Sequence, residues 1–323
     1  MRRSMLFIPG NTPNLLVNAN ILGADSLIFD LEDAVSPAEK DAARILVRNA
    51  LATLSFAGTE TVVRINSIDT PYWKADLAAI VPQRPDAILL PKTNSPRDIA
   101  ACSLYLAELE DKVGLGKNAI LLFPLIETAR GIENALAIGE ASDRIKGLIL
   151  GGEDLSADLQ AVRSKEGQEL AYARSRIVSC ARACGLDAID TVFTDVNDDE
   201  GIYRDSFLAK SLGFSGKLSI SPRHIATINR VFSPDREEIA HAYAVREAIR
   251  KAKEEGRGVI ALHGKMIDAP VAARAERIIQ AAEELGLAPE ETRGTDEPAE
   301  LFETRTQITM TRDQAEGGST HER

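Results

Sequence analysis

Hydrophobic residues in the first two-thirds of the chain gather in short runs, and segments with helical periodicity separate these runs. The hydrophobic positions within a run are continuous and do not alternate with polar ones, which is typical of parallel strands buried on both faces. The pattern therefore predicts an alternation of strand and helix. The predicted strands are residues 4–8, 26–31, 61–65, 87–91, 119–127, 147–150, 188–193 and 218–221.

The segments between these runs carry the signals of helices. Ser36 before Pro37, and Ser95 before Pro96, place a capping side chain next to a proline at the first helical position. Eight alternations of strand and helix predict a closed parallel (β/α)8 TIM barrel, an α/β fold of about 250 residues, with a doubly wound open sheet as the alternative. The predicted helices are residues 13–22, 36–51, 71–81, 95–109, 129–138, 165–184 and 200–212.

The barrel accounts for residues 1–232, and the remaining chain is longer than barrel closure requires. Residues 233–286 hold further helical patterns around a short apolar run at 258–264. We therefore expect a C-terminal helical extension that covers the mouth or packs on a neighbouring subunit. From residue 287 the sequence is polar with little periodicity, and we expect 287–323 to form a mobile tail.

The charge balance narrows the range of partners. The chain has 38 Lys and Arg against 49 Asp and Glu, and the net charge of -11 argues against nucleic acid or an anionic membrane as a partner. No apolar window reaches the roughly 18 residues of a membrane span, and the apolar run after Arg2 and Arg3 is too short for an export signal. The three cysteines form no paired framework, so we expect reduced thiols and a cytoplasmic protein.

Polar residues gather at the carboxyl ends of the predicted strands, where (β/α)8 barrels place their active sites. Glu127 ends one predicted strand and Asp154 follows the next, so their carboxylates could share one hard cation such as Mg²⁺, with water and substrate as further ligands. The alternative is that both are acids at helix N-termini, favoured by the helix dipole. The polar strand ends are residues 9–11, 30–33, 64–66, 91–92, 127–128, 151–154, 194–195 and 221–223.

A second group of charged residues follows the second, third and fourth predicted strands. Arg64 ends the third strand and could face the two carboxylates. At least one of Asp30, Glu32 and Asp33 is expected to pair with Arg64 or Lys92 and so support the site from behind. For Asp33 a purely structural role as a helix cap fits equally well.

The remaining motifs give weaker indications of a functional site. Residues 114–119 have the glycine spacing of a nucleotide-binding loop but precede a strand, so we interpret them as an ordinary loop. The four histidines show no metal-ligand spacing. Gly151 and Gly152, directly after the sixth strand, would let another group approach the main chain closely.

Nine stretches of the sequence resemble the family of citrate lyase beta-like and malyl-CoA lyase enzymes, in order and over about residues 2–285. The resemblance implies a Mg²⁺-dependent (β/α)8 barrel that cleaves a 3-hydroxyacyl thioester by retro-Claisen chemistry, commonly as a homotrimer. The stretches are RRSMLFIPGN, DSLIFDLEDAVSPAEKDAAR, VVRIN, LLPKT, LIETARGIENA, GLILGGEDLSADL, AIDTVFTDVNDDEG, LGFSGK and GKMIDAPV.

The resemblance also implies roles for individual residues. It makes Glu127 and Asp154 the metal ligands, and Arg64 the cation that holds the substrate carbonyl or carboxylate during catalysis. It makes Asp268 a catalytic acid or base that a neighbouring subunit contributes. The further implied substrate contacts are Phe7, Glu127, Gly151, Gly152 and Glu153, and the implied supporting residues are Glu32, Asp33 and Lys92.

One departure from the family bears on the substrate. Relatives that act on free coenzyme A often carry an Arg and a Lys in a PG-x-R-P-x-x-x-x-K stretch, whereas this chain has Thr12 and Asn18 there. The loss of two phosphate-binding cations favours a thioester on the phosphopantetheine arm of an acyl carrier protein, unless other cations such as Lys92 substitute.

The resemblance implies cleavage of a citryl thioester to oxaloacetate and an acetyl thioester, with the alpha and gamma subunits of citrate lyase as partners. The first alternative is a free-standing malyl-CoA or citramalyl-CoA lyase, or a related thioesterase or synthase, because the same metal, Arg64 and Asp268 would serve any such step. The second alternative is a non-catalytic subunit that binds an acyl carrier protein.

Overall fold

A computed structural model of the 323-residue chain describes residues 1–255, 261–262 and 265–287. All of the predicted tail except Leu287 lies outside the described residues. None of the helices in the described part of the chain is both long and apolar enough to cross a membrane. The three cysteines are free thiols in this structure.

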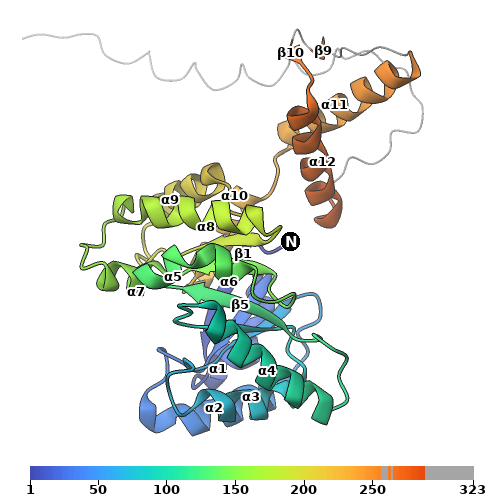
Figure 1. The fold of residues 1–323 in the computed structure, drawn as a ribbon. Coiled ribbons are helices and arrows are strands. Elements are labelled where there is room, and N and C mark those ends of the chain that lie inside the picture. Colours follow the sequence, from blue (N-terminus) through green and yellow to red (C-terminus); the bar gives the residue numbers. More distant parts are fainter. Residues whose placement is uncertain (256–260, 263–264, 288–323) are drawn as a thin grey trace, which may run out of the picture.

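Eight parallel strands close into one barrel in chain order, which confirms the predicted (β/α)8 fold (Figure 1). The predicted strand ends agree with the observed ones to within two residues except at β7, which ends at Asp190 and not at Phe193. Val192 and Phe193 are buried in the loop after β7, so their apolar character reflects loop packing and not strand pairing. The strands are β1 Ser4–Pro9, β2 Ser26–Asp30, β3 Glu60–Arg64, β4 Ala87–Leu90, β5 Leu121–Ile126, β6 Gly147–Leu150, β7 Asp187–Asp190 and β8 Gly216–Ser219.

The helices cover the outside of the barrel and differ from prediction in three main places. The helix predicted from residue 165 begins at Ala171, after a 3-10 turn at Gln168–Leu170. Asn134 interrupts the helix predicted at 129–138, because its backbone leaves helical geometry and its Nδ2 donates to the carbonyl oxygen of Asn94 at 2.8 Å. Helix α7 was not predicted, since it is short and opens on a glycine. The barrel helices are α1 Pro13–Asn18, α2 Lys40–Thr53, α3 Trp73–Ile80, α4 Pro96–Lys112, α5 Ala129–Glu133, α6 Ala135–Gly139, α7 Gly152–Asp158, α8 Ala171–Ala183, α9 Asp199–Leu212 and α10 Pro222–Phe232.

The interior of the barrel is filled by apolar side chains from alternate strand positions, among them Met5, Ile28 and Phe123. At the end where the strands begin, the guanidinium of Arg2 lies 5.0 Å from the centre of the Phe123 ring and pairs with Glu60. This packing closes that end. At the carboxyl ends of the strands, the inward positions include the charged side chains of Asp30, Arg64 and Glu127. This end is called the mouth below.

After α10 the chain leaves the barrel and forms two long helices, α11 (Arg236–Glu254) and α12 (Ala269–Glu284), with β9 (Ala261–Leu262) and β10 (Lys265–Met266) between them. The two helices pack on each other through a small apolar cluster that includes Val245 and Ile279. Figure 1 shows the pair standing away from the barrel, near the chain's N-terminus. Packing of this extension on a neighbouring subunit stays a prediction.

Candidate active site

The mouth of the barrel contains a cavity of about 260 Å³. Its lining combines apolar side chains with a small number of charged ones, which is typical of sites that bind small molecules. The cavity is lined by Phe7, Pro9, Asp30, Asp33, Ala34, Arg64, Leu125, Glu127, Gly151, Gly152, Glu153, Asp154, Thr191, Val192, Leu218 and Ile220.

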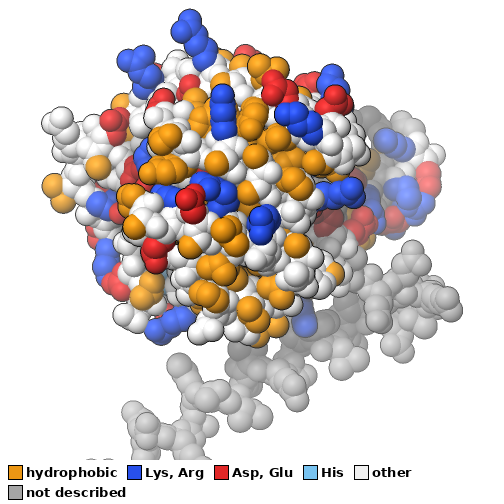
Figure 2. All heavy atoms as spheres, turned by 90° about the horizontal axis from the view of Figure 1, so that it is seen from below, with side chains coloured by type: hydrophobic (Ala, Val, Ile, Leu, Met, Phe, Trp, Pro, Cys, Tyr) orange, Lys and Arg blue, Asp and Glu red, His pale blue; other side chains and the backbone are white. Residues whose placement is uncertain are grey.

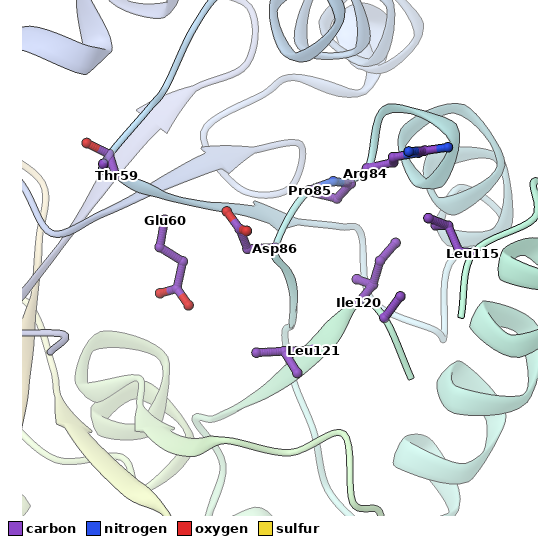
Figure 3. Close-up of a pocket in the computed structure, with 10 residues that line it drawn as sticks. Thr59, Glu60, Arg84, Pro85, Asp86, Leu115, Ile120 and Leu121 are labelled. Carbon is purple, nitrogen blue, oxygen red and sulfur yellow. The ribbon is translucent and has the colours of Figure 1, made fainter. Parts of the chain in front are cut away.

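A larger hollow of about 570 Å³ lies at the opposite end, between the starts of β3, β4 and β5 (Figure 3). Its carboxylates already have protein partners, because Glu60 pairs with Arg2 and Asp86 accepts hydrogen bonds from Thr61. The 114–119 segment reaches this hollow as a loop, as predicted. We therefore place the chemistry in the smaller cavity.

Arg64 is anchored at the cavity floor by neighbouring strands. Its Nε and Nη2 donate to Oδ1 and Oδ2 of Asp30 at 2.7 and 2.5 Å, and its Nη1 lies 3.1 Å from Oε2 of Glu32. Burial opposes the positive charge, but the two carboxylates outweigh burial and raise the pKa of Arg64 above its usual value. The guanidinium also lies 4.7 Å from the centre of the Phe7 ring. Arg64 is thus a permanent, oriented cation in the cavity.

Glu127 follows β5 and points its carboxyl group into the same cavity. Its Oε1 accepts a hydrogen bond of 2.6 Å from the backbone N–H of Lys92. Burial, and then the negative charges of Glu32 and Asp154, raise the pKa of Glu127 to about 8. A buried carboxylate with two acidic neighbours is stabilised by a cation, so the electrostatics of the site fit a bound metal ion.

The two glycines after β6 are required by side chains of the protein itself. A Cβ atom at Gly151 would lie 2.6 Å from Cβ and 2.7 Å from Oε2 of Glu127, and one at Gly152 would lie 2.8 Å from Oγ1 of Thr191. The N–H of Gly152 donates to the same Thr191 oxygen at 2.8 Å. Because position 151 is a glycine, the side chain of Glu127 can lie against the main chain there. This piece of main chain leads directly into Asp154.

Lys92 links the supporting acids to Asp154. Its Nζ lies 2.6 Å from Oε1 of Glu32, 3.2 Å from Oδ2 of Asp33 and 3.6 Å from Oδ2 of Asp154. Among the described residues, no group of three or more His, Cys, Asp or Glu side chains is arranged to hold a metal ion. A metal at the mouth would thus take Glu127 and Asp154 as protein ligands and complete its shell with water and substrate, as Mg²⁺ commonly does.

Comparison with known proteins identifies the family of this chain. Residues 3–222 match the HpcH/HpaI aldolase/citrate lyase family. The chain belongs to this family. The citrate lyase subunit beta of Leuconostoc mesenteroides subsp. cremoris is 45% identical over 282 residues, which cover 87% of this chain and 93% of that protein. The mitochondrial citramalyl-CoA lyase of Rattus norvegicus is 33% identical over 291 residues, which cover 87% of this chain and 86% of that protein.

The solved structures include a family relative with bound ligands. The protein CitE from Mycobacterium tuberculosis, in complex with magnesium, acetoacetate and coenzyme A, aligns with a TM-score of 0.70 at 32% identity. The alignment covers 87% of this chain and 97% of that one. The family and the barrel that the sequence predicts are therefore both confirmed.

Asp268, the remaining residue implied by the family resemblance, does not reach the cavity of its own chain. It caps α12, where its Oδ1 accepts a hydrogen bond of 3.0 Å from the N–H of Val271, and it is exposed to solvent. It is absent from the residues that line the mouth cavity. Within one chain of this family member, the structure thus brings together Arg64, Glu127 and Asp154 but leaves Asp268 outside.

Sequence reasoning missed part of the cavity wall. Thr191, Val192 and Ile220 line the cavity from the ends of β7 and β8, and none was a predicted site residue. The signal was present, because inward-facing positions recur every second residue along a strand and Thr191 continues the series of Ile189. Arg163 was also missed; its Nε pairs with Glu153 at 2.8 Å from the loop after α7.

Proposed function

We propose that this chain is a Mg²⁺-dependent carbon–carbon lyase that cleaves a citryl thioester to oxaloacetate and an acetyl thioester. The observation that carries the proposal is the buried Glu127 carboxyl, whose pKa is raised to about 8, in one cavity with Asp154 and Arg64. The 45% identity to a citrate lyase subunit beta supports the citryl substrate.

Glu127 and Asp154 would hold the metal ion through oxygen ligands. A Mg²⁺ ion bound there lowers the pKa of the substrate hydroxyl and polarises the carbonyl that forms from it. Both acids sit next to Gly151 and Gly152, so the keto-acid half of the substrate lies against this part of the main chain. The backbone and the side chain of Glu153 contribute to that surface.

The residues of the chain provide the rest of the chemistry. The carboxylate of Asp268 from a neighbouring subunit takes the hydroxyl proton, the hydroxyl oxygen becomes the keto oxygen as the carbon–carbon bond breaks, and the electron pair of that bond passes to the acetyl thioester as an enolate. Arg64, held in place by Asp30 and Glu32, stabilises negative charge on the substrate oxygens. Asp268 from a neighbouring subunit of a homotrimer then donates a proton to the enolate carbon. The exposed position of Asp268 on α12 leaves it free to reach another chain.

The thioester reaches the site on an acyl carrier protein, in a cytoplasmic complex with alpha and gamma subunits. Thr12 and Asn18 carry no positive charge, and the side-chain amide of Asn18 donates to the Asn14 carbonyl at 2.8 Å. From Ser4 to Glu39 the sequence contains neither Lys nor Arg. Free coenzyme A, with its several phosphates, therefore finds no cation in this segment.

The proposal is tested by oxaloacetate release, followed as NADH oxidation by malate dehydrogenase, from citryl-CoA and from citryl carrier protein, in Mg²⁺ and in EDTA. Malyl-CoA and citramalyl-CoA are assayed alongside by following their keto-acid products. We expect Mg²⁺-dependent oxaloacetate, released fastest from the carrier-bound substrate. Glu127→Gln, which keeps the shape of the side chain, serves as the inactive control.

The other outcomes have defined meanings. Cleavage of citramalyl-CoA or malyl-CoA alone would keep the mechanism and contradict the citryl substrate. Citramalyl-CoA is included because a citramalyl-CoA lyase is 33% identical to this chain. Binding of the carrier protein without turnover of any thioester would contradict the enzymatic proposal altogether.

A further inference from the structure

The two glycines in the wall of the mouth cavity have no main-chain donor left for a ligand. The N–H of Gly151 donates to the carbonyl oxygen of Ile126 at 3.0 Å, and the N–H of Gly152 donates to Oγ1 of Thr191 at 2.8 Å. Both donors are thus used within the protein. A carboxylate that lies against these two glycines must therefore take its hydrogen bonds from other groups.

Thr191 follows β7 at a position that faces the same cavity. Inward positions recur every second residue along a strand, and Ile189 belongs to the apolar filling of the barrel. Thr191 continues that series, lines the cavity and is 1% exposed. Its side chain is therefore directed inward and is shielded from bulk water.

The hydroxyl group of Thr191 has a donor that the protein leaves unused. A hydroxyl group can donate one hydrogen bond and accept two. Its oxygen accepts from the N–H of Gly152, and no atom in the described part of the chain accepts a hydrogen bond from this hydroxyl. The hydroxyl hydrogen of a buried threonine that lines the cavity is thus available to a ligand.

Contacts of both its side chain and its main chain hold Thr191 in this position. A Cβ atom at residue 152 would lie 2.8 Å from Oγ1 and 3.0 Å from Cγ2 of Thr191, so the side chain packs directly on Gly152. The carbonyl oxygen of Thr191 accepts a hydrogen bond of 2.6 Å from Nζ of Lys217, which is itself fully buried. The hydroxyl is thus fixed against the main chain that leads into Asp154, a proposed metal ligand.

We propose that Thr191 is a further substrate-binding residue, whose hydroxyl donates a hydrogen bond to a carboxylate of the keto-acid half of the substrate. The inference rests on the proposed function, which places that half of the substrate against Gly151 and Gly152. The N–H of Gly152 polarises the hydroxyl that accepts from it, because hydrogen bonds in series strengthen one another. Thr191 thus extends the donor of Gly152 into the cavity.

The experiment measures the binding of oxaloacetate to the full-length protein in Mg²⁺ by isothermal titration calorimetry. Thr191→Val keeps the shape of the side chain without its hydroxyl. We expect the dissociation constant of oxaloacetate to rise about 10- to 100-fold in this variant, because a hydrogen bond to a charged group is lost. Thr191→Ser keeps the hydroxyl and should bind oxaloacetate with nearly the affinity of the wild type. Circular dichroism establishes that each variant is folded.

The binding of Mn²⁺, an ion that suits the same oxygen ligands as Mg²⁺, separates a substrate contact from a purely structural role. If Thr191 only held α7 in place, loss of its hydroxyl would displace Asp154 and weaken the binding of Mn²⁺ in the absence of oxaloacetate. We expect the dissociation constant of Mn²⁺, measured by electron paramagnetic resonance without oxaloacetate, to be the same in Thr191→Val and in the wild type.

Two further variants sharpen the test. Thr191→Cys carries the test if the valine variant fails to fold, because a thiol still accepts from the N–H of Gly152 but is a weak donor. We expect it to lose affinity for oxaloacetate as well. Thr93→Val is the matched control, because Thr93 is also 1% exposed but lies outside the cavity lining and donates its hydroxyl to the carbonyl oxygen of Leu90 at 2.9 Å. This control should bind oxaloacetate as the wild type does.

Each alternative result contradicts a specific statement. Wild-type affinity for oxaloacetate in folded Thr191→Val and Thr191→Cys would overturn the role of Thr191 and leave the proposed function intact. An equal loss in Thr191→Ser or in Thr93→Val, or a loss of Mn²⁺ affinity that matches the loss of oxaloacetate affinity, would overturn that role as well. No binding of oxaloacetate to the wild type in Mg²⁺ would overturn this inference together with the proposed citryl substrate.

Discussion

Two clusters in this barrel both combine carboxylates with Lys and Arg side chains, but one is buried with its charges matched and the other faces a cavity with an excess of carboxylates. The closed cluster lies between the sheet and helices α8 and α9 and consists of Arg174, Asp190, Asp205 and Lys217. Its two cations and two carboxylates pair at 2.6–2.9 Å, and each side chain is at most 5% exposed. The open cluster at the mouth faces a cavity and contains more carboxylates than cations.

The difference separates a structural use of buried charge from a functional one. In the closed cluster every charge has an opposite partner, so it fixes α8 and α9 on the sheet and offers nothing to a ligand. At the mouth Arg64 and Lys92 partner Asp30, Glu32 and Asp33, and burial leaves Glu127 with a pKa of about 8. A cation from solution can therefore bind to the open cluster, which has unmatched negative charge, but not to the closed cluster.

The largest effect is expected where the open cluster loses a metal ligand. Asp154→Asn removes the negative charge that would hold Mg²⁺, and we expect turnover of the citryl thioester to fall about 1,000-fold, because metal stabilisation of the transition state supplies several kcal/mol. Asp158→Asn, on the same helix but outside the cavity, is the control and should stay active. Near-normal turnover of Asp154→Asn at saturating Mg²⁺ would contradict the metal assignment.

The open cluster also lacks a proton donor of its own, since Asp268 lies outside the cavity of its chain. Asp268→Asn should lower turnover on the order of 100-fold or more, the usual contribution of a general acid. Mixed oligomers of Asp268→Asn and Glu127→Gln chains should recover activity, because some sites then combine two intact residues. Absence of recovery in verified mixed oligomers would argue that sites are not shared between chains.

A substitution in the closed cluster should lower the stability of the fold. Lys217→Met leaves Asp190 and Asp205 buried beside one remaining cation, so we expect the free energy of unfolding to fall by about 3–5 kcal/mol in urea titrations. The control is Lys210→Met, whose half-exposed pair with Glu238 spans 3.5 Å and should contribute at most about 1 kcal/mol. Equal losses in the two variants would remove the distinction between a buried matched cluster and a surface pair.

The smallest predicted effect is a pH dependence at the mouth. Because burial raises the pKa of Glu127 to about 8, this carboxyl keeps its proton at lower pH, and Mg²⁺ must displace that proton to bind. Mg²⁺ affinity should therefore rise about tenfold per pH unit below 8 and level off above it, as linkage to one proton requires. Calorimetric titration at pH 6.5, 7.5 and 8.5 measures this, and a constant affinity would contradict the assignment of Glu127.

Much of the site was predictable because, in a parallel barrel, residues at the carboxyl ends of all strands lie at the same face. Arg64 and Glu127 lie at the carboxyl ends of predicted strands and Asp154 follows one, and the rule that strand ends meet at one face was enough to group them. The apolar lining from Val192 and Ile220 was not predicted, because hydrophobic residues near strand ends are equally consistent with ordinary packing. Helix α7 was missed for a similar reason, since seven residues are too few to show helical periodicity.

The sequence by itself determined the order of strands and helices, the closed barrel and the family, because hydrophobic runs, capping signals and motif spacing are local properties of the chain. Only the tertiary structure decided which charges meet. The register of β2 against β3 sets Asp30 beside Arg64, and the left-handed backbone of Lys92 aims its N–H at Glu127. Burial and these distant neighbours together set the pKa of Glu127, so no local pattern could have revealed it.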